Sequence, residues 1–221
     1  MFKQTDSELQ ANVLRELEWD SRVDHTDIGV AVRHGIVTLT GEVNSWAKRV
    51  AAQEAAHRVQ GVLDVANDVR VRFDTIGPRS DADIAQAVRD TLDWNVLVPA
   101  SRIRSTVSDG RITLEGEVDF LAQRDDAEKA ISHLAGVRQV INDIVVKPPR
   151  AFHTTDVRRA IHDALGRRAA RESERLKIEA NQGVVTISGS VHTWAEKKAA
   201  IGAARGTPGV CSVQDDIRIE P

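Results

Sequence analysis

The feature that most constrains this chain is a threefold internal repeat. The nine residues GIVTLTGEV at 35–43 return as GRITLEGEV at 110–118 and as GVVTISGSV at 183–191. The copies start 75 and then 73 residues apart, and with these offsets the whole chain aligns to itself without gaps over 67 residues per copy. Length alone would suggest one or two domains, but the repeat predicts three units. Their expected bounds are residues 1–73, 79–148 and 153–221.

Each unit begins with a predicted helix followed by a β-hairpin. Leu9, Val13 and Leu17 are spaced four apart, as on one face of a helix, and the same spacing returns in the other two units. A hydroxyl residue with a carboxylate three positions later marks the start of the helix in units one and two, as Thr5 with Glu8 does. Two alternating strands then flank His34-Gly35, Asp109-Gly110 and Gln182-Gly183, which are typical of two-residue hairpin turns with positive φ.

A second, alanine-rich helix and a third strand complete each unit. Ala52, Ala55, Ala56 and Val59 form a helical stripe of small residues, which predicts close packing on a sheet. The third strand returns parallel to the second by a right-handed crossover. The predicted fold class is therefore α+β, with three tandem αββαβ units, each a mixed three-stranded sheet with two helices on one face.

Six glycines at repeated positions are predicted to be structural. One set lies in the central strands, where we expect a close-packed helix or backbone to exclude a side chain: Gly41, Gly116 and Gly189. The other set follows the second helix, where we expect left-handed C-caps: Gly61, Gly136 and Gly209.

Two further sets of repeated residues have a structural interpretation. The four tryptophans occupy two repeat positions, Trp19/Trp94 and Trp46/Trp194, which predicts packing in the core or between units. The polar pair of the third strand, such as Asn67 and Asp68, could suggest a cation site. Alternating strand side chains point to opposite faces, however, so hydrogen bonding near the start of the strand is the favoured interpretation.

Composition places limits on location and chemistry. The chain has no apolar signal-peptide core and no run of about 18 apolar residues, which predicts a soluble, cytoplasmic protein without a transmembrane segment. The single Cys211 cannot form an internal disulfide, and we expect it to be a buried, inert thiol. Net charge is −3, but unit three is basic, with 11 basic and 9 acidic residues.

Nothing in the sequence predicts catalysis. The seven histidines do not occupy equivalent positions, and no zinc-binding spacing of Cys and His occurs. No nucleophile and base can be assigned, so we expect a non-enzyme without cofactor or metal. A mildly acidic chain with four Trp, four Phe and no Tyr also gives no support for nucleic-acid binding.

The repeated motifs resemble the BON domain family, an OsmY-like group of bacterial proteins. The resemblance rests on G-x-[VI]-T-[LI]-x-G-x-V, on the alanine-rich helix, and on the third-strand motif in GVLDVANDV, GVRQVINDI and GVCSVQDDI. It covers nearly the whole chain as three tandem copies. It implies a non-enzymatic module, associated with osmotic or envelope stress, that binds phospholipid membranes or proteins. Periplasmic relatives carry signal peptides, and we expect this chain to lack one.

Two segments that break the repeat are candidate contact sites. Unit two has WNVLVPA at 94–100, where Val96, Leu97 and Val98 could form an apolar loop tip for a membrane or a partner, with at least one of them folded back onto the core. Unit three has Arg168, Arg171 and Arg175, which would share a helix face and suit anionic headgroups, although interleaved glutamates weaken this interpretation.

We expect an anionic phospholipid surface as ligand. The alternative is a protein-binding or holdase-like scaffold without lipid affinity, and the oligomeric state stays open.

Overall fold

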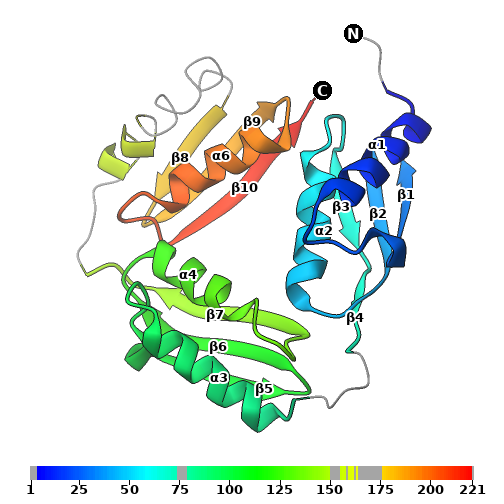
Figure 1. Cartoon of the computed structure of the whole chain (residues 1–221). Helices are drawn as coiled ribbons and strands as arrows, with labels where there is room; N and C mark the ends of the chain where they lie inside the picture. The colour runs from blue at the N-terminus through cyan, green and yellow to red at the C-terminus, as the bar shows by residue number, and fades with distance from the viewer. Residues whose placement is uncertain are drawn as a thin grey trace.

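The computed structural model describes residues 4–73, 79–149, 155–157, 159–161, 163 and 176–220. Unit two shows the architecture in full, as α3 (Asp81–Trp94), a 3-10 turn η2 (Ala100–Arg102), β5 (Ile103–Ser108), β6 (Arg111–Val118), α4 (Leu121–Ile131) and β7 (Gln139–Val146). Strand β6 is central, antiparallel to β5 and parallel to β7. The predicted α-β-β-α-β order and mixed sheet are confirmed, and both helices cover one face of the sheet (Figure 1).

Unit one repeats this fold with one interruption. Its elements are α1 (Asp6–Trp19), η1 (His25–Asp27), β1 (Ile28–Arg33), β2 (Ile36–Val43), α2 (Trp46–Arg58), β3 (Asp64–Asn67) and β4 (Arg70–Val71). Strands β3 and β4 both pair with β2 in parallel, so together they are the third strand of the unit. Between them the ladder continues through the backbone N–H of Asp68, which donates to the Leu39 carbonyl at 2.8 Å.

Unit three contains β8 (Leu176–Asn181), β9 (Val184–Val191), α6 (Trp194–Arg205) and β10 (Ser212–Ile219). Strand β9 is central, antiparallel to β8 and parallel to β10, as in the other units. Of the segment equivalent to α1 and α3, Val157 and Ile161 are buried. The apolar positions predicted from helical spacing therefore reach the core in this unit too.

The local signals for helix starts and turns are confirmed. Thr5 and Ser80 form capping boxes with Glu8 and Asp83, which satisfy backbone N–H groups that have no partner within the helix. Both residues of each hairpin turn have positive φ, for example 54° at His34 and 78° at Gly35. Short-range hydrogen bonding and turn geometry therefore fix the register of each hairpin.

Two of the central-strand glycines, Gly41 and Gly116, are required because neighbouring backbone lies close to them. At Gly116, φ is 139° and a Cβ atom would lie 2.2 Å from the carbonyl oxygen of Arg102, the last residue of η2. At Gly41, φ is 121° and the corresponding distance to the Asp27 carbonyl oxygen is 2.0 Å. Each glycine thus lies against the backbone that enters the first strand. The expected close approach of backbone is confirmed, and the alternative of a close-packed helix is wrong at these two positions.

The second helices end earlier than their glycines suggest. Helix α2 ends at Arg58 and its C-cap is Val59, so Gly61 lies beyond the helix in a turn, with φ of 94°. Gly136 and Gly209 have φ of 94° and 91° after the shorter helices α4 and α6. These glycines supply the predicted left-handed backbone, but in the turn that leads to the third strand.

The apolar core is divided unequally among the units. Unit one has its own cluster of buried residues, whereas the buried residues of units two and three form one continuous cluster. Trp46, the first residue of α2, packs against the cluster of units two and three. The units are therefore in direct apolar contact with one another.

Candidate functional site

The loop after α3 presents apolar side chains to solvent. Val96 is 97% exposed and Leu97 is 62% exposed, while Trp94 at the end of α3 is 87% exposed. We call these three residues the unit-two tip. Val98 is only 7% exposed and joins the core, which confirms that one residue of this segment folds back.

Hydrogen bonds around Asn95 hold the tip in place. The Asn95 side chain accepts a hydrogen bond from the backbone N–H of Leu97 at 3.0 Å, and its carbonyl accepts one from Val98 at 3.1 Å. Such an Asx turn is a compact local structure. With Val98 anchored in the core, the turn directs Val96 and Leu97 outward. The tip is thus a defined surface feature of unit two.

Unit one has the same backbone position but different chemistry. Val23, equivalent to Val98, packs on the core, whereas Ser21 and Arg22 stand where Val96 and Leu97 stand in unit two. Arg22 donates to both carboxylate oxygens of Asp20, at 3.0 and 2.8 Å. Only unit two therefore carries an aliphatic tip among the two loops of this type that the structure describes.

The prediction for the tryptophans is correct at one repeat position and wrong at the other. Trp46 and Trp194 are half-buried at contacts between units. Trp19 and Trp94 are 80% and 87% exposed, so they pack neither in the core nor between units. Each lies two residues after the last inward-facing leucine of its helix, and two residues turn a helix by about 200°. The helical spacing itself placed them on the outer face.

The basic candidates lie outside the described part of the chain. Arg168, Arg171 and Arg175 belong to residues whose structure is not described, so their common face stays a prediction. Arg159, at the start of the same segment, forms an ion pair with Asp156 at 2.6 Å.

The polar position of the third strand binds the second helix. The side-chain amide of Asn67 donates to the Arg49 carbonyl at 3.0 Å, and that of Asn142 donates to the Arg124 carbonyl at 2.9 Å. In unit three an aspartate cannot donate, and Asp215 instead pairs with Lys197 at 2.9 Å. The hydrogen-bonding interpretation is confirmed.

No group of three or more His, Cys, Asp or Glu among the described residues could hold a metal ion.

Cys211 is half-buried in unit three. Burial raises the pKa of its thiol above the usual range, because the charged thiolate is less well solvated there. A thiol with a raised pKa is a poor nucleophile at neutral pH. The raised pKa agrees with the expected inert thiol, whereas the expected burial is only partial.

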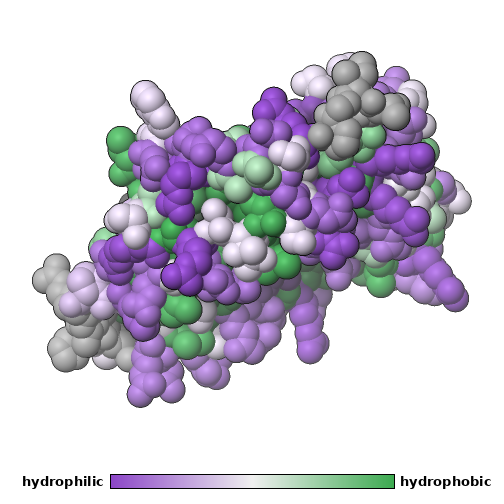
Figure 2. All heavy atoms as spheres, turned by 90° about the horizontal axis from the view of Figure 1, so that it is seen from below, coloured by the Kyte–Doolittle hydropathy of each residue, from purple (hydrophilic) through white to green (hydrophobic). Residues whose placement is uncertain are grey.

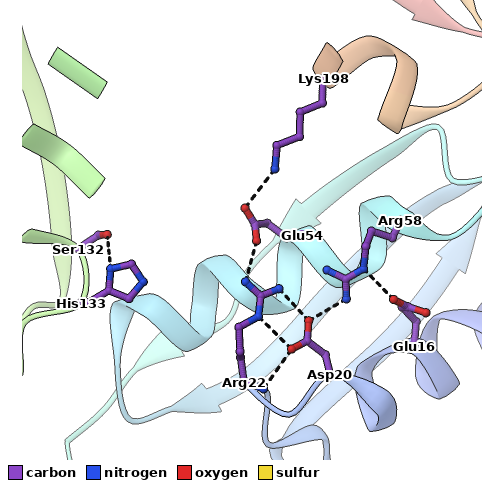
Figure 3. A network of polar contacts seen from close by, with 8 residues as sticks. All are labelled: Glu16, Asp20, Arg22, Glu54, Arg58, Ser132, His133 and Lys198. Carbon is purple, nitrogen blue, oxygen red and sulfur yellow. Dashed lines mark hydrogen bonds and ion pairs between the residues drawn. The ribbon is translucent and has the colours of Figure 1, made fainter. Parts of the chain in front are cut away.

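A network of charged residues connects unit one with unit three (Figure 3). Asp20 accepts hydrogen bonds from Arg22 and from Arg58, and the pKa of its carboxyl is well below the usual range chiefly because of the bond from Arg22. Arg22 also donates to Glu54 on α2 at 3.1 Å. Glu54 in turn pairs with Lys198 on α6 at 3.4 Å. The network therefore ends on another unit.

The contacts between units join corresponding ends of the second helices in cyclic order. His57 of α2 stacks on Trp194 of α6, with ring centroids 3.7 Å apart. Arg205 of α6, which is equivalent to His57 in the repeat, pairs with Asp125 of α4 at 2.9 Å. His133, just after α4, lies beside the N-terminal end of α2 (Figures 1 and 3). The C-terminal part of each second helix thus meets the N-terminal part of another.

None of the described helices has both the length and the apolar character that crossing a bilayer would require.

The chain is similar to proteins of known family. The family model of the BON domain matches residues 5–72, 80–148 and 153–221. Osmotically-inducible protein Y of Escherichia coli (strain K12) is 32% identical over 146 residues, which cover 64% of this chain and 73% of that protein. The 21 kDa hemolysin of Actinobacillus pleuropneumoniae is 27% identical over 142 residues, which cover 63% and 73%. A solved structure of CdsD, a structural protein of the type III secretion system of Chlamydia trachomatis, aligns over 97% of this chain and 93% of its own, with 12% identity and a TM-score of 0.28.

Proposed function

The chain belongs to the BON domain family, and from this premise we propose that it is a stress-associated binding protein whose ligand is an anionic phospholipid surface. The stress association is supported by a relative named as osmotically inducible. The membrane assignment is supported by the phospholipid binding that the family resemblance implies and by a relative named as a hemolysin. The proposed activity is binding without catalysis.

The observation that carries this proposal is the unit-two tip. Tryptophan is favoured at membrane interfaces because its ring is apolar and its N–H is polar. Burying a fully exposed Val or Leu side chain contributes about 1.5–3 kcal/mol each. Val96 and Leu97 are exposed on a turn that already holds them outward, so little ordering is needed on contact. The expected result is reversible binding, far weaker than insertion of a transmembrane helix.

Charge decides which unit approaches the surface. Units one and two are acidic, whereas unit three has 11 basic and 9 acidic residues. Each Lys or Arg near an anionic membrane contributes about 1 kcal/mol. We propose that Arg168, Arg171 and Arg175 supply this attraction and that the unit-two tip adds apolar contact. Because exposed charges are screened over about 8 Å at physiological ionic strength, binding should weaken with added salt.

The distribution of apolar surface favours a local contact. On the face shown in Figure 2, hydrophobic residues form small patches separated by hydrophilic side chains. A holdase-like scaffold needs a broad apolar surface to bind unfolded chains. The pattern on this face agrees with a local contact.

Co-sedimentation with anionic and with neutral liposomes tests the proposal. We expect the full chain to sediment with anionic vesicles at low salt, and Leu97→Ser to reduce the bound fraction several-fold. Ile36→Ser is the matched control, because Ile36 is also an exposed aliphatic residue but lies in unit one. If the native protein ignores anionic liposomes at low salt, the lipid proposal is wrong and a protein partner takes its place. The cytoplasmic location stays a prediction, which cell fractionation would check.

A further inference from the structure

The contact between units one and three contains an unusual pair of side chains. The rings of His57 and Trp194 are stacked with an interplanar angle of 22°. Both His57 Nε2 and Trp194 Nε1 are buried, and neither has a hydrogen-bond partner among the described residues. Buried polar atoms in folded proteins normally have such partners. The contact therefore leaves His57 Nε2 without an acceptor if this atom carries a proton.

The charged groups around His57 come from three elements. Lys197 and Lys198 of α6 disfavour a proton on the ring, while Glu54 of α2 and Asp64 of β3 favour it. Glu54 is already paired with Arg22 and Lys198, so its charge is largely compensated. The Lys197 ammonium also lies 5.1 Å from the centre of the Trp194 ring, so the indole already makes a cation–π contact with a lysine.

The docked arrangement thus favours neutral histidine. Burial is the largest cause that lowers the pKa of His57 below its ordinary value, and the two lysines act in the same direction. A cation stacked on indole is attracted to the ring, but a protonated His57 would keep a buried N–H without an acceptor. Separation of the units would return the imidazole to water, where the charged form is well solvated.

We propose that the contact between His57 and Trp194 is an acid-sensitive latch, and that uptake of a proton by His57 releases unit three from unit one. The pKa of His57 is lower in the docked state than in the separated state, so the separated state takes up the proton first as the pH falls. The contact is therefore fully stable above the ordinary histidine pKa of about 6.5 and is weakened below it. The direction is the one expected of a histidine buried as the neutral form.

A distance measurement on the full chain tests the latch. Nitroxide labels on Arg33→Cys and Glu179→Cys, in a Cys211→Ser background, report the separation of units one and three from exposed strand positions. At about pH 7.5 we expect one narrow distance distribution, and at about pH 5 a broad distribution at longer distances. His57→Phe keeps an aromatic ring for stacking but cannot take up a proton, so its distribution should stay narrow at both pH values. Trp194→Leu should be broad at both.

Two results would overturn the inference. One is an unchanged distribution for the native sequence over this pH range. The other is a His57→Phe variant that opens as the native sequence does, because the responsible group would then be a carboxylate such as Glu54. Far-UV circular dichroism checks that each variant is folded, and His57→Gln gives a second neutral replacement if the phenylalanine variant does not fold.

Discussion

Gly116→Ala should destabilise unit two strongly although it adds a single methyl group. The new Cβ would lie 2.2 Å from the Arg102 carbonyl oxygen and 3.1 Å from the Ile103 Cα atom. A carbon and an oxygen in contact are normally about 3.3–3.6 Å apart. The obstacle is backbone at the start of β5, so no side chain can rotate away to make room.

The magnitude has two sources. A φ of 139° is a conformation that alanine adopts at a cost of about 1–3 kcal/mol. Moving the η2 backbone away from the new methyl adds an overpacking cost of about 1–3 kcal/mol. For a domain of this size each kcal/mol lowers the melting temperature by about 4–8 °C. The expected loss is therefore about 2–6 kcal/mol, or a fall of roughly 10 °C or more in the transition of unit two.

Thermal and urea unfolding followed by circular dichroism measure this effect. Gly206→Ala is the control, since its φ of −78° suits alanine and its nearest contact would be an ordinary 3.4 Å to the Gly202 carbonyl. We expect the control to change the free energy of unfolding by less than about 1 kcal/mol. Equal melting temperatures for the two variants would refute the argument from backbone contact.

Two further predictions concern charge. A triple variant replaces three arginines of unit three by glutamate: Arg168→Glu, Arg171→Glu and Arg175→Glu. It should abolish sedimentation with anionic liposomes and leave the circular dichroism spectrum unchanged. Binding that survives these replacements would assign the contact to the unit-two tip alone. Asp20→Asn should remove an acid-dependent part of the stability. The pKa of the Asp20 carboxyl is lowered in the folded state, so its contribution to the free energy of unfolding is present above its unfolded pKa of about 3.9 and is lost as the pH falls. In urea titrations the native protein should therefore lose stability towards pH 3 more steeply than the variant. Parallel titration curves would contradict this.

Much of the fold could be predicted because its signals are local. The turn at Asp109-Gly110 and the capping box of Ser80 depend on residues within three or four positions of each other, and the structure confirms them. Helical spacing also predicts that Val13 and Leu17 are core residues, and both are fully buried. The unit-two tip was recognised from the sequence because it departs from the repeat, although its use as a binding site stays a prediction.

What the sequence could not predict depends on contacts between distant segments. The reason for Gly116 is a carbonyl of the preceding loop, which no spacing along the chain reveals. His57 gave no signal, because equivalent positions carry a serine and an arginine and the contact lies between different units. The exposure of Trp94 follows from its two-residue offset to Leu92, which places it on the opposite side of the helix.

The cyclic contacts among the second helices have a consequence for how such chains can evolve. In an open array of repeats, a copy can be gained or lost at either end, because each copy touches only its neighbours along the chain. Here the first copy contacts the last through His57 and Trp194, so the three copies form a closed ring of contacts. A fourth copy would have no interface to occupy, and a loss of one would leave two helix ends uncovered. We expect the number of copies in close relatives with these contact residues to be held at three by geometry, while linker length and loop sequence are free to vary.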